Sequence, residues 1–178
     1  MYRIAICEDE PSMAQENEAM ICRILEARHF QRDIDFSVSG FSAAGPLLTV
    51  LQKQPAAFHL LLLDIGLAQE NGMELAKRLR ELNVGCSIIY ITSYAEYMSD
   101  SFATHPLEYL MKPVDEERLE KAIKWDLQKN HRPGQIALPV RGGLRKVEAK
   151  DILYAEAVNH KSAVHLPGEE IPVNLSFR

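Results

Sequence analysis

The sequence predicts an α/β protein built on a parallel sheet, followed by a smaller all-β unit, and three observations carry that prediction. Four consecutive leucines at 60–63 do not alternate with polar residues, which is typical of a strand buried on both faces by helices. Strand-like and helix-like segments alternate five times along residues 1–129, which favours parallel strands joined by right-handed crossovers. Beyond residue 134 only short strand-like runs occur, which indicates the second, all-β unit.

Each element has its own signal in the sequence. Short apolar runs that end at polar residues predict strands at 3–7, 34–38, 58–64, 87–91 and 108–111. Apolar residues at helical spacing predict helices that open at Pro11 and Asp115 and helices over 42–54, 73–82 and 94–103. In the second unit, strands are expected at 136–140, 144–147, 152–157, 163–166 and 171–173, with a turn at Gly142-Gly143. Residues 130–134 are expected to form a linker, and residues 175–178 resemble the opening of a helix.

Composition and charge place the chain among ordinary globular proteins. Its 178 residues are 47% hydrophobic and 25% charged, with a formal net charge of -5, which argues against binding nucleic acid over the whole surface. Residues 1–130 carry 13 basic and 20 acidic side chains, whereas residues 131–178 carry seven and five, so the tail differs in charge from the body. No apolar run approaches the roughly 18 residues of a membrane helix, and no signal peptide is recognisable. We therefore expect a cytoplasmic protein without a membrane partner.

Polar side chains follow the expected strands at the points where these strands end. Glu8 and Asp9 follow the first strand, Asp64 the third, Thr92 the fourth and Lys112 the fifth. Because the carboxyl ends of parallel strands lie along one edge of a sheet, these side chains should meet in one cleft. Carboxylates 4 Å apart repel by about 4 kcal/mol at an effective dielectric near 20, and a divalent ion with hard oxygen ligands relieves that repulsion. The sequence therefore predicts a Mg²⁺ site in this cleft.

The same cleft suits a phosphoryl group. A metal ion and the Lys112 ammonium would neutralise phosphoryl oxygens, and the Thr92 hydroxyl would donate a hydrogen bond. Asp64, at the centre, is then the candidate nucleophile. Taken alone, Asp64 could equally start a turn or cap the next helix, but that interpretation leaves the other strand ends unexplained.

Residues 1–129 resemble the receiver domain of two-component response regulators. The resemblance rests on Glu8-Asp9, on Asp64 with Asn71-Gly72 after it, on Thr92, and on Tyr109 three residues before Lys112-Pro113. It implies a flavodoxin-like fold with a five-stranded sheet in the order 2-1-3-4-5. It also implies that Asp64 accepts a phosphoryl group from the phosphohistidine of a sensor histidine kinase.

The resemblance assigns roles to the residues around Asp64. Asp9 would ligate Mg²⁺ directly together with Asp64 and the carbonyl of Gly66, and Glu8 would lie behind Asp9 as part of the metal set. Thr92 and Tyr109 would form the switch pair. Lys112 would bridge to the phosphoryl group, and its peptide bond to Pro113 is a candidate cis bond. In one departure, family members often have Met-Pro where this chain has Leu67-Ala68, and the loss of proline frees a φ angle and loosens the loop.

Residues 135–178 resemble the first part of a LytTR-type DNA-binding domain, the domain of the LytR/AlgR family. The segment Asp-Ile-Leu-Tyr-Ala-Glu at 151–156, followed by Asn159-His160-Lys161, carries this resemblance. It implies that Asn159, His160 and Lys161 approach DNA, since Asn and Lys can donate to base edges or phosphates. The alternative is a merely solvated hairpin loop. Because the match covers only part of the usual domain, we expect a truncated domain that does not bind DNA specifically by itself.

The main hypothesis is a phosphorylation-controlled transcription regulator. Phosphorylation of Asp64 would promote a homodimer that presents paired β-domains to DNA half-sites. The chain would not be an enzyme in the ordinary sense, because its chemistry would be self-catalysed phosphotransfer and dephosphorylation at Asp64. Two alternatives stay open. One is a phosphatase-like Mg²⁺-dependent enzyme, although Gly66 occupies the position of its second catalytic aspartate. The other is a receiver that acts only by protein–protein contact, with a vestigial tail.

Overall fold

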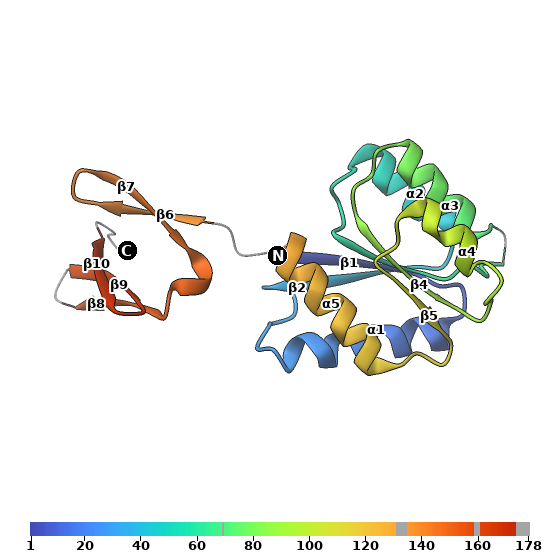
Figure 1. Cartoon of the computed structure of the whole chain (residues 1–178), viewed down its shortest axis with the longest axis horizontal. Coiled ribbons are helices and arrows are strands. Elements are labelled where there is room, and N and C mark those ends of the chain that lie inside the picture. The colour runs from blue at the N-terminus through green and yellow to red at the C-terminus, as the bar shows by residue number, and fades with distance from the viewer. Residues whose placement is uncertain (69, 131–134, 159–160, 174–178) are drawn as a thin grey trace. The chain divides into compact units, whose positions relative to one another are not determined.

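The chain forms two compact units, Met1–Asp126 and Leu127–Arg178. The computed structural model describes residues 1–68, 70–130, 135–158 and 161–173. Figure 1 labels the elements of both units. The predicted division into domains 1–129 and 135–178 stays a prediction, and most of the predicted linker, residues 131–134, lies outside the described residues.

The first unit holds a five-stranded parallel sheet in the order β2-β1-β3-β4-β5. Its strands are β1 (Tyr2–Cys7), β2 (Phe36–Phe41), β3 (Leu60–Leu63), β4 (Ser87–Thr92) and β5 (Glu108–Met111). Its helices are α1 (Pro11–Glu26), α2 (Ala44–Lys53), α3 (Gly72–Glu81), α4 (Met98–Ser101) with the 3₁₀ helix η1 (Phe102–Thr104), and α5 (Glu116–Asn130). The predicted flavodoxin-like fold is confirmed.

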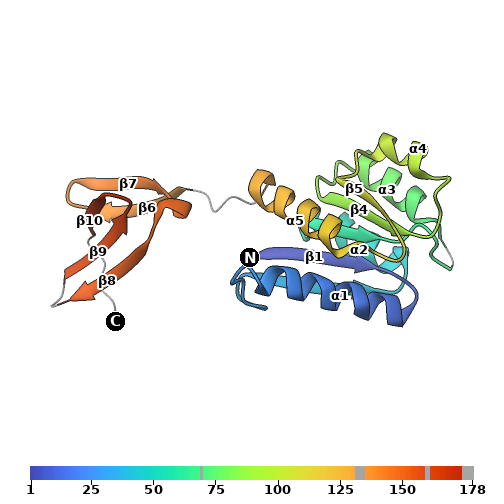
Figure 2. The same cartoon turned by 60° about the horizontal axis from the view of Figure 1, so that its bottom comes forward.

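Helices cover both faces of this sheet. Helices α1 and α5 lie on one face, and α2, α3 and α4 lie on the other (Figures 1 and 2). All four leucines of β3 are buried because the central strand has helices on both sides. The carboxyl ends of β1, β3, β4 and β5 open along one edge of the sheet, which is where α/β folds bind ligands.

Two helices begin with side-chain caps close to that edge. The Asn71 side-chain oxygen accepts a 2.7 Å hydrogen bond from the backbone N–H of Met73, at the start of α3. An Asp115 carboxylate oxygen accepts bonds of 3.0 and 3.3 Å from the backbone N–H groups of Glu117 and Arg118, at the start of α5. Each cap satisfies donors that the first helical turn leaves unpaired, so these helices begin at fixed points beside the strand ends.

The second strand differs from its predicted position. Ile34, its expected first residue, is 66% exposed and precedes the strand. The strand begins at Phe36, which pairs with Tyr2, and continues to Phe41, which pairs with Cys7. Parallel pairing with β1 therefore sets both ends of β2, whereas the local alternation of polar and apolar residues does not.

The helix predicted over 94–103 is much shorter in the structure. It consists of the single α-helical turn of α4 followed by η1. The backbone carbonyl of Tyr94, which would accept the first bond of a longer helix, instead accepts the hydroxyl of Tyr109. The N–H of Met98 bonds to the carbonyl of Ala95 at 3.2 Å. A tertiary contact thus replaces the first turn of the expected helix.

A buried carboxylate of α5, Asp126, is hydrogen-bonded to the sheet at its opposite edge. Asp126 is 0% exposed and accepts a 2.6 Å hydrogen bond from the Tyr2 hydroxyl, at the start of β1. It also accepts a hydrogen bond from the hydroxyl of Ser87, at the start of β4. Burial, together with the Asp126 charge, holds the pKa of Tyr2 well above its usual value, so this hydroxyl stays protonated and can donate.

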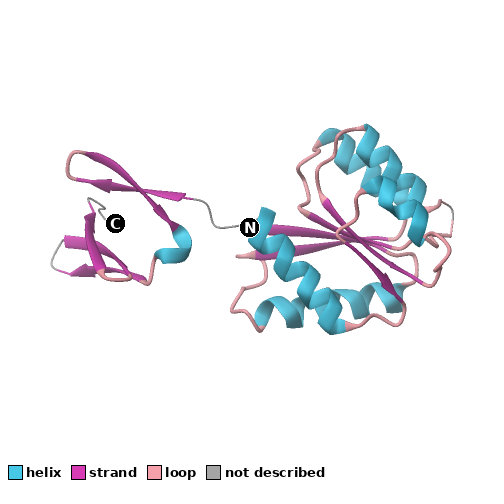
Figure 3. Cartoon of the chain, viewed as in Figure 1, coloured by secondary structure: helices cyan, strands magenta, loops and turns pink. Residues whose placement is uncertain are grey.

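Beyond the end of α5, the described residues of the second unit form antiparallel strands and a short 3₁₀ helix (Figure 3). Its elements are β6 (Gln135–Val140), β7 (Gly143–Glu148), η2 (Ala149–Asp151), β8 (Tyr154–Val158), β9 (Lys161–Leu166) and β10 (Glu169–Val173). Strands β6 and β7 form a hairpin, and β10, β9 and β8 form a three-stranded sheet. Its small core contains Leu138, Val147, Val164, Ile171 and Val173. The predicted helix opening at 175–178 lies outside the described residues.

No helix in the described part of the chain is both long enough and apolar enough to cross a bilayer.

Candidate functional site

Asp64 directly follows β3 and is 7% exposed. The backbone N–H of Gly66 donates a 2.9 Å hydrogen bond to one Asp64 carboxylate oxygen. The start of α3 approaches the same residue so closely that a Cβ on Gly72 would lie 2.0 Å from the Asp64 carbonyl oxygen. The predicted turn at Asn71-Gly72 therefore has a packing reason, because a side chain at position 72 would displace the backbone of Asp64.

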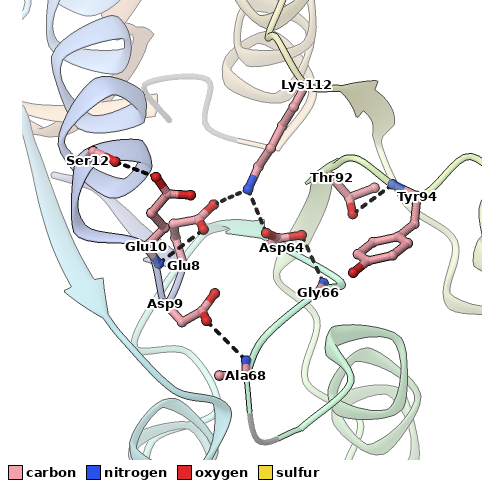
Figure 4. Close-up of polar contacts among 10 residues, drawn as sticks. All are labelled: Glu8, Asp9, Glu10, Ser12, Asp64, Gly66, Ala68, Thr92, Tyr94 and Lys112. Carbon is pink, nitrogen blue, oxygen red and sulfur yellow. Dashed lines mark hydrogen bonds and ion pairs between the residues drawn. The ribbon is translucent and has the colours of Figure 1, made fainter.

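Lys112 joins two of the clustered carboxylates (Figure 4). Its Nζ lies 2.6 Å from Asp64 Oδ2 and 2.8 Å from Glu8 Oε2. Burial alone lowers the pKa of this ammonium, but the hydrogen bonds to Asp64 and Glu8 outweigh burial and leave the pKa of Lys112 above its usual value. Burial raises the pKa of Glu8, and the hydrogen bond from Lys112 opposes that rise. The peptide bond that follows Lys112 is cis, as expected.

Asp9 completes a group of three carboxylates. One ligand atom from each of Glu8, Asp9 and Asp64 lies within 4.8 Å of the others. Asp9 forms no ion pair with any cation among the described residues; its Oδ2 accepts a 3.2 Å hydrogen bond from the backbone N–H of Ala68. Proline has no such N–H, so the Ala68 that departs from the family pattern supplies a contact that proline could not make.

Thr92 lies beside the carboxylates (Figure 4), and both Thr92 and Tyr109 contact the backbone of Tyr94. Thr92 is 0% exposed, and its hydroxyl oxygen accepts a long hydrogen bond of 3.4 Å from the backbone N–H of Tyr94. The Tyr109 hydroxyl donates to the backbone carbonyl of Tyr94. Burial, followed by the charge of Glu96, raises the pKa of Tyr109 to about 12, which keeps that hydroxyl protonated. The ring of Tyr94 borders a hollow of about 510 Å³ that Gly66 also lines.

A family model described as the response regulator receiver domain matches residues 4–124. The chain belongs to this family. The predicted relationship to response regulators is confirmed, and the first unit is a receiver domain.

The chain is also similar to a known sensory transduction protein and to solved receiver structures. The sensory transduction protein LytT of Bacillus subtilis is 36% identical over 166 residues, which cover 87% of this chain and 65% of that protein. The chain therefore spans less than two thirds of the length of this relative. A CheY-like receiver domain protein from Methanospirillum hungatei JF-1 is 28% identical, with a TM-score of 0.60 over 75% of this chain and 99% of its own. The response regulator TrrA of Thermotoga maritima, whose structure is a complex with Mg²⁺ and BeF, shares the fold at 24% identity and a TM-score of 0.56, over 71% of this chain and 100% of its own.

The receiver brings the predicted site residues together as expected from the strand ends. Glu8, Asp9, Asp64 and Lys112 form one cluster, with Thr92 next to it. Gly66 contacts Asp64 through its N–H, and its predicted use of the carbonyl for metal binding stays a prediction. Asn159 and His160 lie outside the described residues, and Lys161 is the first residue of β9, so their DNA contacts also stay predictions.

Sequence reasoning missed one feature of the site and one of the tail. The departure from Met-Pro draws attention to Ala68, but the sequence does not predict that the Ala68 N–H donates to Asp9. In the tail, His165 matches no ligand spacing in the sequence, yet one atom each of Glu156, His165 and Glu170 lies within 4.8 Å of the others. The tail cluster is a cross-strand group in which His165 Nε2 is 3.1 Å from Glu156 Oε1. Pairing across β8, β9 and β10 creates it, which no linear spacing reveals.

Proposed function

We propose that this receiver is phosphorylated on Asp64 by a sensor histidine kinase and thereby controls transcription. The observation that carries the proposal is the Lys112 ammonium, which is 2.6 Å from Asp64 Oδ2 at a strand end surrounded by further carboxylates. A cation held against a buried carboxylate is positioned to meet the negative oxygens of an incoming phosphoryl group.

Mg²⁺ fits the residues of this cleft. Three carboxylates share one nearby ammonium, and Asp9 lacks a cationic partner among the residues that the structure describes, so the group carries uncompensated negative charge. Hard oxygen ligands at this spacing suit Mg²⁺, and Asp9, Asp64 and the Gly66 carbonyl would hold it, with Glu8 behind them. When bound, the ion would neutralise charge on the transferred phosphoryl group.

The chain's own groups supply the nucleophile and orient the phosphoryl group. A carboxylate oxygen of Asp64 bonds to phosphorus while the P–N bond of the kinase phosphohistidine breaks, and the imidazole leaves. Lys112 orients the phosphoryl oxygens, and the Gly66 N–H holds the other Asp64 oxygen at 2.9 Å. Water later attacks phosphorus and releases inorganic phosphate, which makes dephosphorylation a self-catalysed property of the same site.

Thr92 and Tyr109 couple phosphorylation of Asp64 to a structural change at the exposed residue Tyr94. Thr92 lies beside Asp64, and its hydroxyl can donate to a phosphoryl oxygen; a shift of the hydroxyl toward that oxygen would strain or break its long contact with the Tyr94 N–H. Because Tyr109 holds the Tyr94 carbonyl, the backbone N–H and the backbone carbonyl of Tyr94 both depend on the switch pair. The resulting change promotes a homodimer and, through it, DNA binding.

Acetyl phosphate tests the phosphorylation. With Mg²⁺, the intact mass of the chain should increase by one phosphoryl group, and chelation of the metal or Asp64→Asn should abolish the increase. Asp100→Asn, which alters an exposed carboxylate outside the site, should have no effect. Phosphoryl uptake by the Asp64→Asn variant at the wild-type level would contradict the assignment. Thr92→Ala should still be phosphorylated but should lose phosphate-dependent dimerisation in sedimentation experiments.

The second unit is proposed to supply DNA contacts. The relationship to LytT and the antiparallel architecture of the tail support a LytTR-type domain that includes residues 135–178, with Asn159, His160 and Lys161 nearest to DNA. In the natural full-length protein, His160→Ala should weaken phosphate-dependent DNA binding in a gel-shift assay, whereas His29→Ala, in the receiver, should not. Equal binding by both variants would show that His160 does not contact DNA, whereas the absence of DNA binding by the unsubstituted protein would favour the alternative receiver that acts by protein contact alone.

A further inference from the structure

Tyr90 is a fully buried tyrosine of β4 that the proposed phosphorylation chemistry does not use. It is 0% exposed and lies two residues before Thr92, on the same face of the strand. Its ring packs against the ring of Tyr109, its partner across the β4–β5 pair, with centroids 5.7 Å apart and planes tilted by 48°. One side of Tyr90 therefore touches a member of the proposed switch pair.

The hydroxyl of Tyr90 reaches the end of the α4–η1 segment (residues 98–104). Tyr90 Oη lies 2.9 Å from Oγ1 of Thr104, which is the last residue of η1 and 0% exposed. Thr104 Oγ1 donates to the Ser101 carbonyl at 2.7 Å. A hydroxyl has one hydrogen, so Thr104 accepts in the contact with Tyr90. The Tyr90 hydroxyl, which also lies 3.5 Å from the weakly accepting Met73 Sδ, is then the donor to Thr104. The two hydrogen bonds thus run from Tyr90 of β4 to Thr104, and from Thr104 to the Ser101 carbonyl within the segment.

Helix α3 holds the same end of the segment from another side. Arg80 Nε donates a 2.7 Å hydrogen bond to the Thr104 carbonyl, and Arg80 Nη1 donates to the carbonyls of Val84 and Cys86 at 2.7 and 3.0 Å. Helices α3 and α4 accordingly lie side by side (Figures 1 and 2). The Thr104 end of the segment is thus tied both to the sheet and to a neighbouring helix.

The opposite end of the segment has a different kind of support. Residues 93–97 form no regular helix, and Tyr94 is 45% exposed. Its backbone is held by the hydroxyls of Thr92 and Tyr109, the two residues proposed to respond to phosphorylation. One end of the segment is therefore held by residues that take no part in the proposed phosphorylation chemistry, and the other is held by the switch pair itself.

We propose that Tyr90 and Thr104, the hydroxyl anchor, fix the far end of the α4–η1 segment so that phosphorylation turns the segment about Thr104. Tyr90 is then a positioning residue: it couples the packing of Tyr109 to a fixed point of the segment without touching the phosphoryl group. The turning rests on the proposed function, because it requires Thr92 and Tyr109 to respond to phosphorylation. The anchoring itself exists in the unphosphorylated chain and can be tested there.

Amide hydrogen exchange of the whole chain tests the hydroxyl anchor. Tyr90→Phe keeps the ring and removes the hydroxyl, so the amides of 98–105 should exchange about two- to tenfold faster, which corresponds to one net hydrogen bond. Tyr97→Phe is the matched control, because it removes from the same region a tyrosine hydroxyl that makes no hydrogen bond to the described residues. After treatment with acetyl phosphate, the wild type should change mainly at 93–97. In Tyr90→Phe the change should extend to Thr104.

A second pair of variants tests the same bond from the other side. Thr104→Val has nearly the same shape as threonine but breaks the hydroxyl chain, whereas Thr104→Ser keeps it, so exchange should increase in the first variant and not in the second. Wild-type exchange at 98–105 in both Tyr90→Phe and Thr104→Val would overturn the anchor. Intact mass of the same samples reports phosphorylation separately. If the wild type acquires no phosphoryl group, the proposed function fails, while exchange in the unphosphorylated chain still decides whether Tyr90 anchors the segment.

Discussion

Replacing Lys112 with methionine should destabilise the receiver by about 3–5 kcal/mol at neutral pH, the usual cost of breaking a buried ion pair from one side. Methionine can fill most of the space of the lysine stem, so little of this cost should come from packing. The cost comes from charge, because the side chains of Glu8 and Asp64 are 2% and 8% exposed and would keep their negative charges without the ammonium.

The same variant should recover in acid. Burial already raises the pKa of Glu8, and the variant loses the Lys112 hydrogen bond that opposes this rise. A group whose folded-state pKa is raised contributes stability below its unfolded pKa and loses it as the pH increases through the folded value. The deficit of Lys112→Met should therefore be largest near pH 7 and should shrink as the pH falls toward 4.5, the ordinary glutamate value. Mg²⁺ should also reduce the deficit, by binding the carboxylates that the substitution leaves without a cation.

Urea unfolding followed by tryptophan fluorescence measures this loss directly. Trp125 is the one tryptophan of the chain and belongs to the first unit, so its signal reports the receiver. Lys77→Met is the matched control: Lys77 Nζ lies 2.7 Å from Glu74, but these side chains are 43% and 69% exposed. Such an exposed, solvent-screened pair contributes little to stability. If the two lysine variants lost equal stability at pH 7, the argument from buried charge would be wrong.

Two further substitutions test the packing of the receiver. Gly72→Ala should push the Asp64 backbone aside, cost about 1–3 kcal/mol and slow phosphoryl uptake, as measured by urea unfolding and intact mass. Gly85→Ala, where a Cβ meets nothing within 4 Å, should leave both measurements near the wild type, and an equal effect of both would refute the close-approach argument. Tyr2→Phe should cost about 1.5–3 kcal/mol in urea unfolding, because it removes a donor from the buried Asp126 carboxylate, and a loss below about 0.5 kcal/mol would show that this bond stabilises little.

The sequence predicts most of the receiver because its strands are defined locally. The leucines of β3 and the residues of β5 give the expected elements, and the polar strand ends predict the cluster around Asp64. Parallel topology then requires little further information, since right-handed crossovers leave few strand orders. These features depend on residues that are adjacent in sequence.

The errors occur where a distant residue decides the local structure. The helix expected over 94–103 is shortened because Tyr109 takes the carbonyl of Tyr94, a partner 15 residues away. The contact between Ala68 and Asp9 joins residues 59 positions apart. No periodicity contains such information, so both features require the folded arrangement.

The Ala68 N–H also provides an NMR signal that reports on cation binding in the cleft. It hydrogen-bonds to Asp9 Oδ2, an atom proposed to ligate Mg²⁺. Chains with proline at this position have no amide proton there, and so they lack the corresponding resonance. In a ¹⁵N-labelled sample, the Ala68 amide should shift as the Asp9 carboxylate exchanges its backbone donor for the metal. One backbone signal would then follow cation occupancy in solution, independently of any phosphoryl transfer.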